Sequence, residues 1–228
     1  MRTVFRLIFA VLALVAVIVM LRTFVVTTYR VTSAGMENRL HRGESVLVDR
    51  WSYGLRTPLE GLFGYHRLNE KAVGRGDVLV FDMPAVGTTD GDMLIGRCVA
   101  VPGDVVYLDS LFVNADAEQH VTSDAMPLYL PQSGGYVEVQ PWNVMLLRNT
   151  LALHEGKHAD VRGDTLLVDG KPVRFAKLNR EYHWIASDNP ADLSGSKIFG
   201  LVPKHLFVGK ACRVWLTKDI GRFLMKVE

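Results

Sequence analysis

The chain has 228 residues, of which 49% are hydrophobic and 22% are charged, and its formal net charge is +2. Such a chain can bury a core and suits one domain, or one domain with an insertion. The nearly neutral charge favours a surface of mixed, solvated charges and gives no indication of nucleic-acid binding. We therefore expect no nucleic acid among the partners.

The first predicted element is an apolar helix at the N-terminus. Residues 7–21 are all apolar, and counting 4–26, with Arg6 and Arg22 reaching the two surfaces, the helix is long enough for a transmembrane anchor. The same run also fits a cleaved signal peptide, for which "TSA" offers small residues at a cleavage site. In either case the arginines near the start favour a cytoplasmic N-terminus, residues 1–6.

After this run the pattern is mostly that of β-strands. The segments "ESVLVD", "GDVLVFDMP", "DMLIGRCVAVPGD", "DVVYLD" and "YHWIASD" are short, rich in β-branched and aromatic residues, and bounded by Gly, Pro and Asp. "TLLVDGKPVRF" predicts a hairpin around Asp169 and Gly170, and "HLFVGKACRVWL" is the closing strand. Residues 143–156, "NVMLLRNTLALHEG", have helical spacing, an Asn to begin the helix and a Gly to end it. The fold is therefore mainly β with a small α/β insertion.

Two cysteines, Cys98 and Cys212, would lie in an oxidising compartment if the chain crosses a membrane. Their spacing is compatible with a disulfide and equally with two separate thiols buried as small hydrophobic side chains.

The segment "HEGKH" matches the H-E-x-x-H zinc motif, with His154 and His158 as ligands and Glu155 as the base. Asp164 even lies where some zinc proteases place a third ligand. The two histidines must share one helical face, however, and Gly156 between them is a helix stop. A zinc metalloprotease is therefore the least favoured alternative, and we expect no metal or other cofactor.

The order of the short motifs resembles that of bacterial signal peptidase I of the Bacteroides type, a family of membrane-anchored serine endopeptidases that remove signal peptides from secreted proteins. The likeness begins with the N-terminal run and the turn "TSAGMENRL". It continues through "RGESVLVDRWSYG", "GDVLVFDMP" and "LIGRCVAVPGD", and ends with "SDNPADLSGSKIFGLVPKHLFVGKA". No single piece is specific, but five pieces in this order with matching spacing are.

The resemblance implies a β-barrel-type core of the signal-peptidase and LexA-like kind, made of residues 27–105 and 180–218. It places an inserted α/β subdomain at 106–179 and a C-terminal tail at 219–228. It also implies that the span at 4–26 is retained as a single-pass anchor in the inner (plasma) membrane, with the main domain on the periplasmic, extracytoplasmic side.

The departures from the family pattern concern its catalytic groups. The nucleophile of the family is the second serine of a Ser-x-Ser-Met turn, and in "SAGM" that place is held by Gly35, just before Met36. The base is a lysine one residue before an arginine, and in "LIGRCVAVPGD" that place is Gly96, ahead of Arg97. Leu193 stands where a serine orients the lysine. Glycine offers neither the hydroxyl nor the amine that the reaction needs.

What persists is the scaffold of the family. The structural motif residues implied by the resemblance are Arg97, Asp104, Asp188 and Asn189. The residues expected to bind an extended peptide are Ser33, Ala34, Gly35, Met36 and Gly96. A glycine inside a predicted strand, as at Gly96, suggests open space beside a cleft. We therefore expect Gly35 and Gly96 to leave space at the positions that the catalytic serine and lysine occupy in the family.

These features favour a pseudopeptidase in protein secretion. Its expected partners are the membrane and either the signal peptides of preproteins or an active signal peptidase that it would assist. The alternative is an active signal peptidase I with a displaced dyad, in which Ser33 is the nucleophile. That displacement would move the attack by roughly 6–7 Å, and a base such as Lys197 or His183 would have to approach Ser33.

Overall fold

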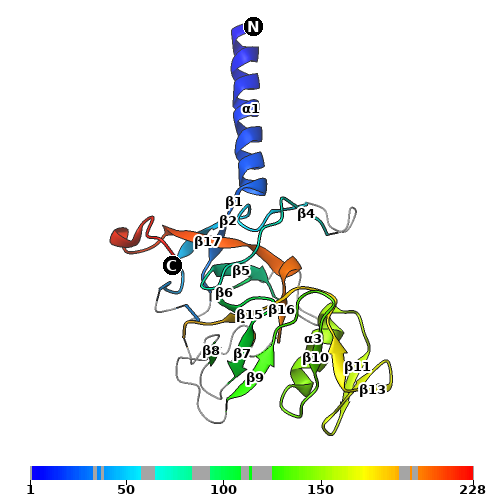
Figure 1. Ribbon diagram of the computed structural model, residues 1–228. Coiled ribbons are helices and arrows are strands. Elements are labelled where there is room, and N and C mark those ends of the chain that lie inside the picture. Colours follow the sequence, from blue (N-terminus) through cyan, green and yellow to red (C-terminus); the bar gives the residue numbers. More distant parts are fainter. Residues whose placement is uncertain are drawn as a thin grey trace.

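The computed structural model describes the chain in several stretches: residues 2–32, 35–36, 39–57, 65–83, 93–108, 113–114, 125–189, 196 and 200–227. Helix α1, Arg2–Phe24, stands away from a β domain (Figure 1), so a helix forms over the predicted apolar run. Its apolar side chains from Val4 to Val19 that the structure describes are exposed. By the length and hydropathy of the described residues, none of the helices qualifies as a membrane span.

The main sheet has seven antiparallel strands in the order β1-β2-β17-β5-β6-β15-β16. Their bounds are Val26–Arg30 for β1, Ser45–Asp49 for β2, Val78–Asp82 for β5, Met93–Ala100 for β6, Tyr182–Ala186 for β15, Val202–Pro203 for β16 and Phe207–Leu216 for β17. The fold is mainly β, as predicted, and β2, β5, β6, β15 and β17 lie in the predicted segments, whereas β1 and β16 have no counterpart among the predicted strands. Alternation of buried and half-buried residues in β2 shows the period of two that the pattern required.

The sheet curls on itself. Tyr29 of β1 donates a hydrogen bond to the carbonyl of Met93 on β6 at 3.1 Å, although three strands stand between them in the sheet order. A buried apolar cluster fills the curl and holds the turn that follows β1, with Val31, Met36 and Leu40 packed among strand residues. The curl therefore brings the first strand of the domain close to the start of β6.

Residues between β6 and β15 form smaller sheets at the end of the domain opposite α1 (Figure 1). The sheet β8-β7-β9 comprises Val113–Asn114, Val105–Leu108 and Met126–Tyr129, and β10, Tyr136–Glu138, pairs with β14, Phe175–Lys177. The sheet β11-β12-β13 comprises Ala159–Arg162, Thr165–Val168 and Lys171–Val173, and it packs with helix α3, Val144–His154. The remaining elements are β3, Leu55–Arg56, β4, Arg67–Leu68, and the short helices η1, Lys204–Leu206, and η2, Ile220–Arg222.

Two local predictions are confirmed in this region. The turn between β12 and β13 has φ of 51° at Asp169 and 77° at Gly170, the left-handed pair that an Asp-Gly hairpin turn requires. Helix α3 ends at His154, and Gly156 follows with φ of 63°. Asn143 occupies the N-cap position but makes no capping bond; its side chain instead accepts a hydrogen bond from the Gln140 N–H.

Both cysteines are free thiols. Cys98 is fully buried, and burial raises its pKa to about 12. Cys212 is half-buried, and burial raises its pKa as well. Of the two interpretations left open by the spacing, the structure has two separate thiols.

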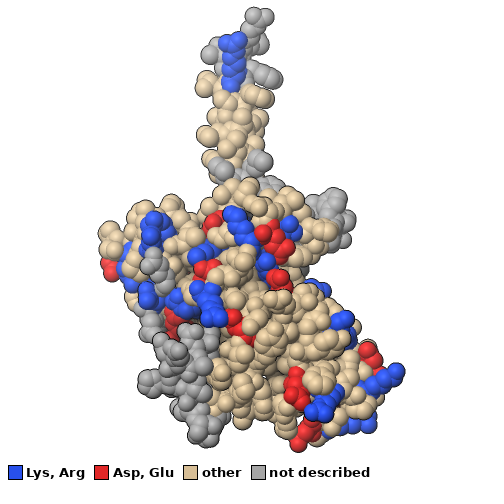
Figure 2. Space-filling model, viewed as in Figure 1, with Lys and Arg blue, Asp and Glu red and all other residues tan. Residues whose placement is uncertain are grey.

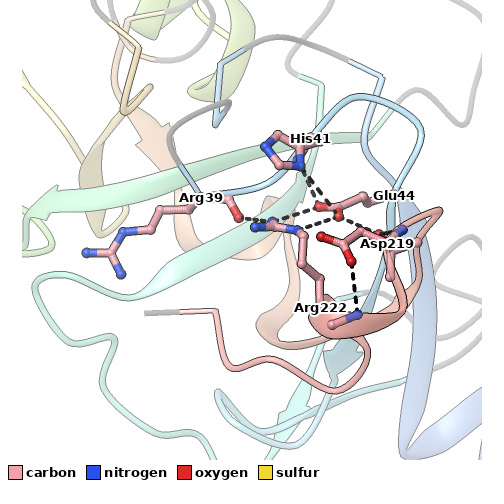
Figure 3. A network of polar contacts seen from close by, with 7 residues as sticks. Arg39, His41, Glu44, Asp219 and Arg222 are labelled. Carbon is pink, nitrogen blue, oxygen red and sulfur yellow. Dashed lines mark hydrogen bonds and ion pairs between the residues drawn. The ribbon is translucent and has the colours of Figure 1, made fainter.

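The C-terminal residues pack against the domain. Val227 is buried, and its N–H donates to the carbonyl of Cys212 on β17. Glu44, at the end of the turn that follows β1, is only 4% exposed and accepts hydrogen bonds from the His41 N–H, Thr217 and Arg222 (Figure 3). The segment after β17 is thus tied to that turn.

Glu44 gives the fold an acid-sensitive contact. Burial alone would raise its pKa, but the hydrogen bonds from Arg222, the His41 N–H and Thr217 outweigh burial and lower the pKa to about 2. A carboxylate whose pKa is lowered in the folded state stabilises the fold at pH values above its usual pKa, near 4.5. This stabilisation is lost as the pH falls toward 2.

We therefore expect Glu44→Gln to lower the free energy of unfolding at neutral pH by about 2 kcal/mol. The gap between variant and native protein should close as the pH is lowered from 4.5 to 2, measured by denaturant unfolding of the full chain in detergent. The control is Glu138→Gln, because Glu138 forms an exposed ion pair with Arg174 and should change stability little. A gap that stays constant with pH would contradict this assignment.

Candidate functional site

The turn between β1 and β2 is fixed by its own backbone and by the core. The Val31 N–H donates to the Glu44 carbonyl and the Gly43 N–H donates to the Val31 carbonyl, each at 2.8 Å. Met36 has no exposed surface, so it supports the turn from inside the core and does not line a surface for peptide, contrary to expectation. Ser33 and Ala34 lie outside the described residues.

Gly35 is held by its carbonyl against the end of β15. That carbonyl accepts hydrogen bonds from the Asn189 N–H at 2.9 Å and from the Ser187 hydroxyl at 2.5 Å. Ser187 is not among the residues predicted from the sequence. The only signal was local, since Ser, Asp and Asn after a strand tend to bond nearby backbone, and the Asn189 N–H does donate to Ser187 at 3.1 Å.

Arg97 and Asp188 join β6 to the same segment. The Arg97 guanidinium donates to both carboxylate oxygens of Asp188, at 2.7 and 2.6 Å, and to the carbonyl of Gly76 at 2.9 Å. The hydrogen bond with Asp188 raises the pKa of Arg97. A bidentate pair of this kind fixes orientation as well as distance, so the end of β15 has a defined position relative to β6.

Gly96 lies against β15 with no free space beside it. A Cβ atom at this position would lie 2.7 Å from Cγ2 of Ile185 and 3.1 Å from the Ala186 carbonyl oxygen. The expectation of open space at Gly96 is therefore wrong. The glycine admits close approach of another strand, at a point where the β6–β15 register shifts just before Ile185.

The predicted positions thus meet around one short segment, residues 185–189. The Gly35 carbonyl accepts a hydrogen bond from Ser187, which lies 152 positions away in the sequence. Arg97 forms an ion pair with Asp188. Gly96 packs against Ile185 and Ala186. We call residues 185–189 the clasp. The clasp contacts both glycines, Gly35 through Ser187 and Asn189, and Gly96 through Ile185 and Ala186.

Comparison with known proteins agrees with the family resemblance that the motifs indicate. The family model described as signal peptidase, peptidase S26, matches residues 4–216. The chain belongs to the signal peptidase family. It is 28% identical to signal peptidase I of Pseudomonas fluorescens over 213 residues, covering 88% of this chain and 68% of that protein. It is also 24% identical to signal peptidase I of Aquifex aeolicus over 234 residues, covering 91% of this chain and 82% of that protein.

Asp104, the fourth scaffold residue of this signal peptidase homologue, is bound to partners outside the clasp. It accepts from Arg75 at 2.7 and 2.5 Å and from the Val101 N–H at 2.9 Å. Burial acts to raise its pKa, but the hydrogen bonds from Arg75 and Val101 hold the pKa below its usual value. Asp104 therefore shapes the turn between β6 and β7.

The clasp region offers backbone groups and an ion pair. Gly35 and Gly96 carry no side chain that could attack a carbonyl or take its proton. His183, named as a substitute base, is buried against Phe207, and burial lowers its pKa to about 3. Lys197, the other substitute, lies outside the described residues.

The H-E-x-x-H segment does not form a zinc site. Helix α3 ends at His154, so His158 lies beyond the helix and is exposed, while His154 is buried. Glu155 accepts from Asn179 and Tyr182, which makes it a structural carboxylate between the insertion and β15. Among the described residues no three potential ligands cluster for a metal.

The close contact at Gly96 makes a prediction about stability. Gly96→Ala should lower the free energy of unfolding by about 1–3 kcal/mol, because the added methyl group must displace Ile185 or the backbone of β15. The measurement is thermal or denaturant unfolding of the full chain in detergent.

Gly74→Ala is the matched control. A Cβ atom there meets Asp77 at no less than 3.4 Å, an ordinary contact. Equal effects of the two substitutions would show that β15 does not press on Gly96.

Proposed function

We propose that this signal peptidase homologue acts in signal-peptide processing and protein secretion without cleaving peptide bonds itself. One observation carries the proposal: the clasp contacts both Gly35 and Gly96, as the family scaffold would require, yet neither residue supplies a hydroxyl or an amine. Its role is to bind or position preproteins, or to assist an active signal peptidase.

The edge of β6 supports binding of an extended peptide. β6 pairs with β5 from Met93 to Arg97, but its other side pairs with β15 only from Arg97 to Ala100. Within the described part of the chain, pairing with β15 does not extend to residues 93–95, where the Met93 carbonyl accepts a hydrogen bond from Tyr29. An added peptide strand would continue the sheet there, with main-chain hydrogen bonds giving affinity.

The proposed location is the inner (plasma) membrane, with residues 1–6 cytoplasmic, 4–26 as a single-pass anchor and the main domain periplasmic. Two features support this arrangement: the uninterrupted apolar run 7–21, and the exposure of its described side chains on a helix that stands away from the domain (Figure 1). The arginines near the N-terminus favour the stated orientation.

Topology gives the first test. A protease added to intact spheroplasts should digest residues 27–228, and N-terminal sequencing of the mature protein should give a start at or near Met1. A mature N-terminus at Ala34 or Gly35 would show that the run is a removed signal peptide.

Catalysis gives the second test. Full-length protein in detergent should leave a purified preprotein uncut under conditions in which signal peptidase I of Pseudomonas fluorescens cleaves it. Both the nucleophile and base places are glycine, so we expect a rate at least about 10⁴-fold lower. Turnover that disappears in Ser33→Ala would overturn the proposal and establish the displaced dyad.

Peptide binding gives the third test. A fluorescent signal-peptide C-region should bind with a micromolar dissociation constant, about −8 kcal/mol at best. The same peptide N-methylated at alternate backbone amides should bind at least tenfold more weakly, because it cannot donate along a strand edge. If neither peptide binds while the intact protein co-purifies with an active signal peptidase, the role is that of a structural partner.

A further inference from the structure

A pocket lined by aromatic side chains lies in the region between β6 and β15. Residues of β9, β10 and β14 line it, and its volume is about 580 Å³, within the range of about 300–1,000 Å³ that ligand pockets span. Tyr129, Tyr136 and Phe175 in its wall are 46%, 58% and 51% exposed, and Trp142 is half-buried. We call this site the aromatic pocket.

The four rings of the aromatic pocket do not stack on one another. Within the described residues, no contact between two rings joins any of the four to another. Tyrosine and tryptophan combine a flat apolar ring with a polar tip. Rings held apart in this way leave their faces available to a ligand.

The acceptors and the charge in the wall are already used by the protein. Asn143 accepts from the Gln140 N–H at 2.8 Å and donates to the Glu138 carbonyl at 3.0 Å. Glu138 is the one charged residue among the described residues that line the pocket, and its carboxylate pairs with Arg174 at 3.2 Å. Figure 2 shows a largely uncharged face where Figure 1 places β9. Charge complementarity therefore selects an uncharged ligand.

The polar groups that remain free in the wall can donate hydrogen bonds. In the part of the chain that the structure describes, the hydroxyls of Tyr129 and Tyr136 and the indole N–H of Trp142 have no hydrogen-bond partner. A phenol hydroxyl can donate, and an indole N–H can only donate. A ligand that carries acceptors and few donors of its own suits these groups.

The backbone beside the pocket does not favour an added β-strand. β9 is an edge strand, because its sheet has the order β8-β7-β9. Pro127 lies within β9 and lines the pocket, and proline has no N–H to offer to a neighbouring strand. Recognition here therefore depends on side chains, unlike the strand pairing proposed at β6.

We propose that the aromatic pocket binds a proline-rich segment in the polyproline II conformation. Proline offers an apolar ring to the aromatic faces and has no N–H, and the carbonyls of this conformation make no internal hydrogen bonds and can accept from the free donors. Aromatic-lined grooves bind such segments well because the ligand is already ordered. The ligand differs from the signal-peptide C-region, so this inference does not depend on the proposed function.

The test is a titration of the full chain in detergent with fluorescently labelled decaproline, followed by anisotropy. We expect saturable binding with a dissociation constant below about 1 mM, and none with a glycine-serine peptide of equal length. Tyr129→Ala with Tyr136→Ala should weaken binding at least tenfold, because it removes two rings and their hydroxyls. Both side chains are exposed, so the fold should be kept, and the thermal midpoint checks this.

Two further variants separate the rings from their hydroxyls and from aromatic surface in general. Tyr129→Phe with Tyr136→Phe keeps the rings and should weaken binding about threefold through the lost donors. The matched control is Trp51→Ala with Phe223→Ala, which removes two rings of similar exposure, 45% and 51%, that do not line the pocket. We expect the control to bind decaproline as the native protein does.

Absence of saturable decaproline binding, or an equal loss in the control, would overturn the inference. An oligosaccharide is the other uncharged ligand that stacks on aromatic rings, and cellohexaose is the probe for it. If cellohexaose binds and decaproline does not, and the double alanine variant loses cellohexaose, the pocket is a sugar site and the inference is wrong.

Discussion

The structure depends on the close packing of the end of β15 against β6. Ile185 and Ala186 approach Gly96 so closely that a Cβ atom there would meet Ile185 at 2.7 Å. This contact sets where β15 ends, and the end of β15 determines where Ser187 and the residues after it lie. The turn that carries Gly35 is then fixed by hydrogen bonds from this segment, and the curl of the sheet brings the turn within reach.

The same packing separates scaffold from chemistry. In an enzyme that uses a hydroxyl and an amine, both groups need space and a defined geometry. Here the backbone around Gly96 is close-packed, and the Gly35 carbonyl is occupied by two donors. In this chain, the end of β15 packs against β6 next to a stretch of β6 that does not pair with β15. Such a frame suits recognition of an extended backbone.

Local features of the fold could be predicted from the sequence because their causes are local. The hairpin turn at Asp169 and the helix end before Gly156 each follow from conformations that few residues adopt. Contacts between distant segments could not be predicted. Ser187 bonds a glycine 152 positions away, and Glu44 meets Arg222 across 178 positions. Neither pair has a sequence pattern, since each depends on how the sheet curls. The close packing of β15 against Gly96 could not be predicted for the same reason.

In the proposed function, this signal peptidase homologue holds no activated nucleophile. The most direct measurement is the intact mass of the full-length protein after incubation with a signal-peptide C-region that carries a fluorophosphonate, which traps an activated serine irreversibly. Signal peptidase I of Pseudomonas fluorescens, treated in parallel, serves as the reactive comparison. We expect an unmodified mass for this chain. A stoichiometric adduct located on Ser33 by fragmentation would contradict it.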